Sequence, residues 1–165
     1  MDLEAVEMAL RAALQQAGAA GLSQLLRQES PAEPHVPCSC GGQSRYKGMR
    51  SKPLLTVLGR AEMRRAYYWC CRCQQGQFST DAALDVENTE LSPGVRRMLT
   101  LVGSECSSFA RGREQMKLLA GLKVTTKAVE RTTESIGAVI ARRSRTPSSK
   151  HYNESCLSRW ARRSR

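Results

Sequence analysis

Two short cysteine-rich stretches, CSCGG at residues 38–42 and CCRC at residues 70–73, decide the fold that this sequence predicts. Each stretch offers a close pair of thiols on a tight turn, and glycine after the first pair relieves the backbone of that turn. When two such turns meet, four thiolates can form a tetrahedron around zinc. The sequence therefore predicts a zinc-ribbon-like module over residues 38–80, in which one structural zinc ion is held by Cys38, Cys40, Cys70 and Cys73.

The ligand set stays open at one position. Only one residue separates the cysteines of the first pair, which is shorter than the usual spacing of zinc ligands, so His35 or Cys71 could replace one of the four. Thiol redox chemistry at Cys70 and Cys73 is the less favoured alternative. The residues after them, Gln74-Gln75-Gly76-Gln77, do not start a helix that would lower a thiol pKa.

The segment between the cysteine pairs predicts a small sheet. Residues 44–50, 54–58 and 61–69 are strand-compatible, Pro53 interrupts them, and a turn is expected at Gly59-Arg60. Arginines on both faces of the last run leave little room for an apolar core. We therefore expect a metal, rather than aromatic packing, to stabilise this module.

Helices are predicted on both sides of the sheet. Residues 1–30 form an N-terminal helix with a leucine-bearing face, which either covers a core or mediates a homo-oligomer, and prolines in residues 31–37 mark a linker. Residues 91–141 predict three helices in a helix-turn-helix-like unit. The first is capped by Ser92-Pro93, the second runs from Ser108 to Ala120 and ends at Gly121, and the third starts near Thr125. The fold class is α+β, with a disordered basic tail over residues 142–165.

The net charge of +11 is distributed in blocks. Residues 38–75, 96–141 and 142–165 are basic, whereas residues 1–37 and 76–95 are acidic. This pattern suggests a nucleic-acid partner more than generic solubility, and charge alone favours such a partner and a solvated basic surface about equally. On the third helix, Lys127 and Arg131 could also simply pair with Glu130 and Glu134. The candidate DNA contacts are Arg45, Lys47, Arg64 and Arg65 in the sheet region, with Lys123, Thr125, Thr126, Lys127 and Arg131 around the start of the third helix.

Several classes of function are not indicated. The acidic residues form no catalytic set, and those between 81 and 90 are interpreted as a solvated loop. His35 and His151 are too far apart to organise nucleophilic catalysis. No apolar run is long enough to cross a membrane, and the first residues are acidic where a signal peptide would be basic, so we expect a cytoplasmic protein.

An ordered set of motifs carries a resemblance to a known group. The strings CSCGGQSRYKGMRSKPLLTVLG, RRAYYWCCRCQQG, ELSPGVRRML and KAVERTTESIGA resemble the N-terminal region of transposases of the ISKra group of insertion sequences, over residues 37–141. This resemblance implies binding of double-stranded DNA at element-end repeats, ahead of a DDE catalytic domain. The sequence departs from the group's pattern at Ala110-Arg111-Gly112-Arg113, where acids and alanines are usual.

Because the resemblance ends near Ala141, it implies that the catalytic domain is absent and that this chain alone is not an enzyme. A frameshift or truncation near that residue would explain the arginine- and serine-rich sequence that follows it. Two other functions stay open. One is a zinc-ribbon module that binds RNA or a protein partner, and the other is a gene remnant without a selected function.

Overall fold

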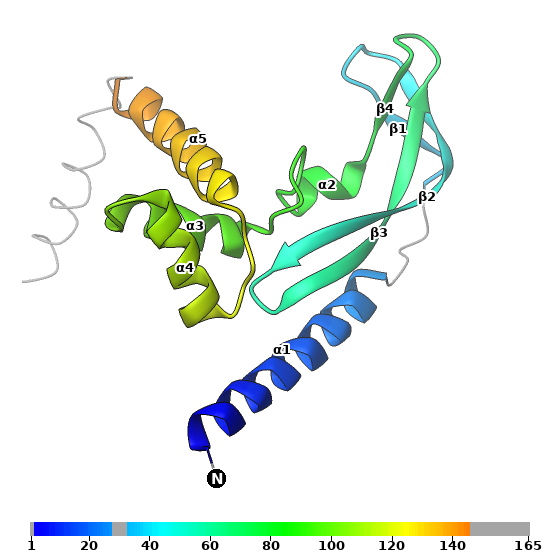
Figure 1. The fold of residues 1–165 in the computed structure, drawn as a ribbon. Helices are drawn as coiled ribbons and strands as arrows, with labels where there is room; N and C mark the ends of the chain where they lie inside the picture. The colour runs from blue at the N-terminus through cyan, green and yellow to red at the C-terminus, as the bar shows by residue number, and fades with distance from the viewer. Residues whose placement is uncertain (1, 28–32, 146–165) are drawn as a thin grey trace, which may run out of the picture.

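The computed structural model describes residues 2–27 and 33–145 and has an α+β fold (Figure 1). A long helix precedes a four-stranded antiparallel sheet, and four further helices follow it. No helix in the described ranges has the length and apolar character needed to cross a membrane. The elements are α1 (Leu3–Arg27), β1 (His35–Pro37), β2 (Gln43–Thr56), β3 (Gly59–Cys70), β4 (Gln75–Gln77), α2 (Ser79–Ala83), α3 (Pro93–Glu105), α4 (Phe109–Ala120) and α5 (Thr126–Arg145).

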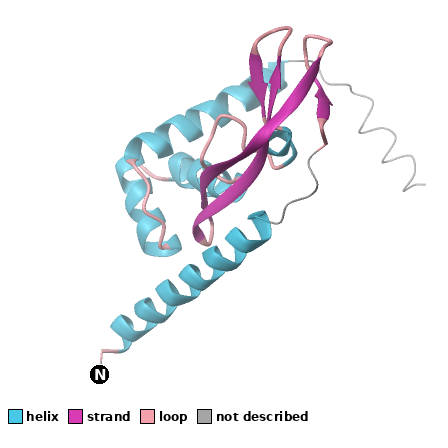
Figure 2. Cartoon of the chain, turned by 90° about the vertical axis from the view of Figure 1, so that its right-hand side faces the viewer, coloured by secondary structure: helices cyan, strands magenta, loops and turns pink. Residues whose placement is uncertain are grey.

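The sheet is built around one long hairpin of β2 and β3, with β1 and β4 added at one end in the order β1-β2-β3-β4 (Figure 2). Thr56 pairs with Gly59, so the turn lies at Val57-Leu58 rather than at the expected Gly59-Arg60. Gly59 is the residue after that turn and has φ +114°, a conformation that favours glycine.

Pro53 lies inside β2 and does not end the strand. The N–H of Leu55 points away from β3 and donates to the carbonyl of Glu90. Backbone N–H groups two residues apart point the same way along a strand, so the nitrogen of Pro53 also faces the side without a ladder partner. The strand therefore continues from Gln43 to Thr56 as a single element, where two runs were expected.

Both open edges of the long hairpin are covered by other segments. On the β3 side, α1 lies along the strand, and the hydroxyl of Ser23 accepts a hydrogen bond of 3.1 Å from the N–H of Glu62. On the β2 side, Leu91 forms a parallel bridge with Leu55, and the N–H of Ser92 donates to the Leu55 carbonyl at 2.9 Å. These contacts satisfy strand edges that would otherwise pair with other chains.

The three C-terminal helices form a unit with its own apolar core, and their starts lie where the sequence predicts them. Ser92 and Ser108 cap α3 and α4 by accepting hydrogen bonds from the third residue beyond each. Gly121 ends α4 with φ +67°, a left-handed conformation typical of a helix C-terminus. The buried residues of this core are Val95, Leu99, Met116, Leu122 and Val129.

Two boundary predictions are wrong. The stretch His35–Pro37, expected to be linker, forms β1 and pairs with Gln43–Arg45, because proline and its neighbours are compatible with a short edge strand. Helix α5 continues through Arg145, so residues 142–145 are not a disordered tail, since arginine is a good helix former and no proline interrupts them. Residues 146–165 lie outside the described part of the chain.

Candidate metal centre and basic surface

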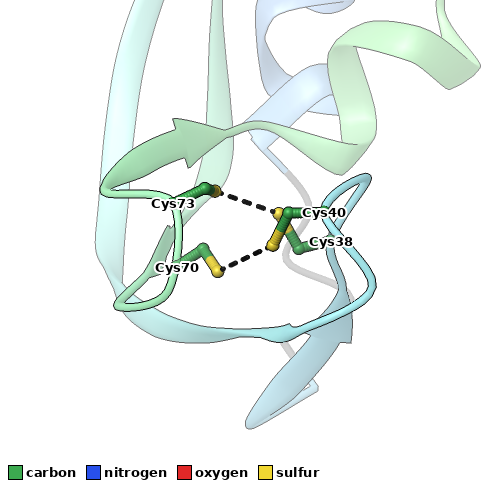
Figure 3. Close-up of side chains that lie close together, drawn as sticks. All are labelled: Cys38, Cys40, Cys70 and Cys73. Carbon is green, nitrogen blue, oxygen red and sulfur yellow. Dashed lines mark hydrogen bonds between the residues drawn. The ribbon is translucent and has the colours of Figure 1, made fainter.

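Four cysteines converge at the end of the sheet where β1 and β4 flank the hairpin (Figure 3). Cys38 and Cys40 come from the turn between β1 and β2, while Cys70 is the last residue of β3 and Cys73 lies in the turn between β3 and β4. All four Sγ atoms lie within 4.8 Å of one another, and the pairs Cys38–Cys73 and Cys40–Cys70 are each 3.6 Å apart. A zinc–sulfur distance of about 2.3 Å gives a tetrahedron with edges of about 3.8 Å, close to these separations.

The local sequence explains why both turns close tightly. In the first turn, the N–H of Cys38 donates to the Gly42 carbonyl and the N–H of Gly41 donates to the Cys38 carbonyl, each at 2.9 Å. Gly41 has φ +78°, and a Cβ at Gly42 would lie 3.4 Å from the sulfur of Cys40. Glycines at these positions therefore let the chain fold around the thiols.

Backbone N–H groups favour the ionised form of two of these thiols. The N–H of Cys40 lowers the pKa of Cys38 to about 6, and the N–H of Cys73 is the main cause of a lowered pKa at Cys70. In contrast, burial raises the pKa of Cys73 to about 12. Closely spaced thiolates repel one another, so a cation among them is what would stabilise the fully ionised set.

Neither suggested substitute ligand takes part in the cluster. His35 is exposed in β1, and Cys71 is exposed in the turn that carries Cys70 and Cys73. Among the described residues, the group of His, Cys, Asp and Glu side chains that could hold a metal ion is the four-cysteine set expected from the sequence. The short spacing of the first pair is accommodated because the turn continues through Gly41 and Gly42.

The candidate DNA contacts fall into two groups on different elements. Arg45 and Lys47 lie exposed on β2, as does Arg64 on β3. The second group lies at the other end of the hairpin, in the loop before α5 and in the first two turns of that helix. Thr126 is half-buried there, and the exposed residues are Lys123, Thr125, Lys127 and Arg131. The hydroxyl of Thr125 accepts a hydrogen bond from the N–H of Ala128, so this residue also caps α5.

The charge of Arg65, unlike that expected of a DNA contact, is used inside the protein. This residue forms an ion pair with Asp81 of α2 and stacks on the ring of Phe78, with its guanidinium carbon 3.6 Å from the ring centroid. Its side chain is 15% exposed. The expectation that Arg65 contacts DNA is therefore not supported, since a phosphate would have to displace a buried carboxylate.

Sequence reasoning missed the partner residues of this ion pair. Asp81, interpreted as part of a solvated loop, is buried, and Lys52 donates to its carboxylate at 3.1 Å and to the Val86 carbonyl at 2.5 Å. The signal was the alternation of β2, which places Lys52 on the same face as the buried Leu54. A charged residue on that face requires a buried partner.

One flank of α5 faces acidic residues. A groove of about 640 Å³ runs between α5 and the loop that joins α2 to α3. Arg131 lines this groove on the helix side, and Glu87 and Glu90 line it on the loop side. A phosphate bound at Arg131 would meet these carboxylates, whereas Lys127 does not line the groove.

A family model covers more than half of the chain. It is described as an uncharacterised protein family, UPF0236, and it matches residues 42–155. The chain belongs to the UPF0236 family. The UPF0236 match includes Cys70 and Cys73 but begins just after Cys40, and it continues beyond Ala141, where the expected resemblance ended. A search of the curated proteins found no match.

Proposed function

We propose that this chain binds duplex DNA in a sequence-directed manner, as the N-terminal, non-catalytic part of a transposase. The observation that carries the proposal is the arrangement of α4, the turn at residues 121–125 and α5. The two helices share an apolar core through Met116 and Val129, while the start of α5 is exposed and bears Lys123 and Lys127. This arrangement is what a helix-turn-helix unit needs in order to present its second helix to a major groove.

The first turns of α5 would make two kinds of contact. Lys123 and Lys127 would bind phosphates, which position the protein without reading sequence. Thr125 keeps its hydroxyl proton available as a donor because its oxygen accepts from the backbone, so it could reach a base edge. Arg131 would contribute less than Lys127, since Glu87 and Glu90 face it across the groove.

The cysteine cluster would act as a structural zinc centre of a zinc-ribbon-like module. Four thiolates fill the tetrahedral coordination of zinc and leave no position for a water molecule, so the ion would supply stability rather than Lewis-acid chemistry. Its place at the end of the sheet would fix β1 and β2 there, and with them the exposed side chains of Arg45 and Lys47. These cations would form a second contact with the DNA backbone.

The proposal is tested by the salt dependence of binding to duplexes selected from a random-sequence pool. Replacing Lys127 and Arg131 together by alanine should weaken binding and reduce the slope of log affinity against log salt by about two phosphate contacts or fewer. The matched control replaces Arg113 and Lys117 by alanine, because this pair has the same spacing on α4 and is also exposed. An unchanged slope for the α5 variant would contradict the proposal.

Two further measurements sharpen this test. Replacing Glu87 and Glu90 by glutamine should strengthen binding, because these carboxylates repel a phosphate near Arg131. Selected duplexes should bind far more tightly than duplexes of random sequence at the same salt concentration. Equal affinity for an RNA of the same sequence, or failure of the selection to converge, would favour the RNA- or protein-binding alternative.

A further inference from the structure

One apolar face in the N-terminal half of helix α1 is exposed in the described structure. The C-terminal half of this helix packs along β3, where Ala19 is buried, but its N-terminal half exposes a row of apolar side chains. Leu3, Leu10 and Leu14 are 66%, 60% and 65% exposed, and Val6 lies between them. Their spacing places all four on one face of the helix. Figure 1 shows this half of α1 extending away from the rest of the protein.

The exposed face is nonetheless held in a fixed position. Arg11 and Gln15, on a different side of the same helix, donate hydrogen bonds to the carbonyls of Leu118 and Ala120 at 3.0 and 2.6 Å. These bonds satisfy carbonyls at the C-terminus of α4 that have no partner within that helix. The start of α1 is capped by the carboxylate of Asp2, which accepts from the N–H of Ala5. The leucine row is therefore presented by an anchored helix.

A second element, α4, also exposes large apolar side chains. Leu118 and Leu119, in the last turn of α4, are 63% and 71% exposed and lie where Arg11 contacts that helix. Large apolar side chains exposed in a row on one helix are typical of a protein interface. An isolated stretch of helix this short is marginally stable in water, so burial of the leucine row would stabilise it.

The charges on α1 indicate what covers this face. Asp2, Glu4 and Glu7 are acidic and precede the cationic Arg11. A parallel pair of these helices would bring six carboxylates and two positive helix ends together, whereas an antiparallel pair keeps the two acidic helix starts at opposite ends of the interface. The same antiparallel register sets Leu3 opposite Leu14, so charge and apolar spacing agree.

We infer that a second copy of this chain covers the face, through antiparallel pairing of the N-terminal halves of two α1 helices around a twofold axis. In this arrangement Val6 and Leu10 of one protomer pack against Leu10 and Val6 of its partner. The interface centres between residues 8 and 9, and the C-terminal half of α1 stays on its own sheet. The dimer is independent of DNA binding, because none of its residues belongs to α5 or to the cysteine turns.

The test is sedimentation equilibrium of the full chain and of two matched variants. Leu10→Glu places one carboxylate from each protomer in the interface. It should therefore raise the dimer dissociation constant by about 100-fold or more. Leu25→Glu is the control, because Leu25 is 64% exposed on the same face of α1 but lies outside the antiparallel overlap. The native chain and the Leu25 variant should both be dimers. A monomeric native chain, or equal weakening by both variants, would overturn the inference.

The direction of pairing has its own test. Glu7→Arg should strengthen a parallel dimer by removing repulsion between acidic ends, whereas an antiparallel dimer already keeps those ends apart and should not be strengthened. Helix content from circular dichroism and zinc content report whether each variant is folded, since the altered side chains are exposed and none belongs to the cysteine cluster. Stronger association of the Glu7 variant would contradict the antiparallel arrangement.

Discussion

The cysteine end of the sheet and the three-helix unit are stabilised in different ways. Around the cysteines, the fully buried side chains are Cys70 and Ser44, with the ring of Tyr68 beside them. The helical unit instead buries five apolar side chains, of which Val95, Leu99 and Val129 are completely inaccessible to solvent. The first region depends on convergent thiols, and the second depends on burial of apolar surface.

One short chain can therefore combine two regions that are stabilised in different ways and that could not share a single core. The centre of the hairpin lies between the two and contains a small cluster of buried apolar residues, Leu54, Met63 and Val86, against which Leu26 of α1 packs. Beside this small core it buries Lys52 and Asp81. Substitutions in the three regions should therefore change the stability of the protein by different amounts. Their effects should also extend to different distances from the substituted residue.

The largest expected effect follows loss of a cysteine ligand. Cys73→Ser, or a strong chelator, should abolish zinc binding and unfold the turns that carry the thiols, because a structural zinc site of this type supplies about 10–16 kcal/mol. The helical circular dichroism signal of α3, α4 and α5 should persist, since their core does not include the cysteines. Zinc content and the fluorescence of Trp69, which pairs with Arg45 near the cluster, provide the measurements.

Cys71→Ser is the matched control, because Cys71 is exposed and does not belong to the cluster. This variant should bind one zinc ion per chain, as the native protein should. Equal loss of zinc in both variants would show that the ligand set is different. Less than one zinc ion in native protein purified without chelators would contradict the metal centre itself.

A smaller effect is expected at the buried ion pairs of the hairpin. Asp81→Ala leaves Lys52 and Arg65 without their shared carboxylate, and the free energy of unfolding should fall by about 3–5 kcal/mol. Asp85→Ala is the control, because its carboxylate is 77% exposed and pairs with Arg96 at the surface, where about 1 kcal/mol or less is at stake. Urea denaturation of both variants measures the difference, and similar losses would refute this role for burial.

The sequence was informative where a local signal set the structure. Ser92, Ser108 and Gly121 predict helix ends because capping depends on residues within one turn, and all three lie at the helix ends observed. The convergence of four cysteines that could hold a metal ion was equally predictable, since thiol pairs on tight turns leave few alternatives. These features need no knowledge of which elements meet.

Features that depend on contacts between distant parts of the chain could not be predicted from local sequence. Nothing near Asp81 in sequence shows that Lys52 and Arg65 lie beside it, because the ion pairs depend on how α2 packs on the hairpin. The turn at Val57-Leu58 was predicted two residues too late. Glycine is typical of turns, but Gly59 is the residue that follows this one. The leucine face of α1 was recognised, yet its burial could not be inferred, and most of it is exposed.

The helical unit should respond to loss of apolar burial. Leu99→Ala removes a completely buried side chain from the centre of the core and should lower the free energy of unfolding by about 2–5 kcal/mol. Leu101→Ala, on the same helix but 60% exposed, should change it by about 0.5 kcal/mol or less. Thermal unfolding followed by circular dichroism compares them. Loss of zinc in the Leu99 variant at a temperature where its helices are folded would contradict the separation of the two regions.

The smallest effect is expected at the cap of α4. Ser108 has an extended backbone, and its hydroxyl accepts a hydrogen bond from the N–H of Arg111, which otherwise has no partner inside the helix. Ser108→Ala should lower the free energy of unfolding by about 1 kcal/mol, and Ser108→Gly by only a few tenths, because glycine leaves that N–H open to water. Ser107→Ala is the matched control, since Ser107 is exposed and precedes the cap. If the two alanine variants lose equal stability, the cap does not contribute. Unchanged zinc content in all three variants would show that a local weakening of the helical unit does not reach the cysteine end.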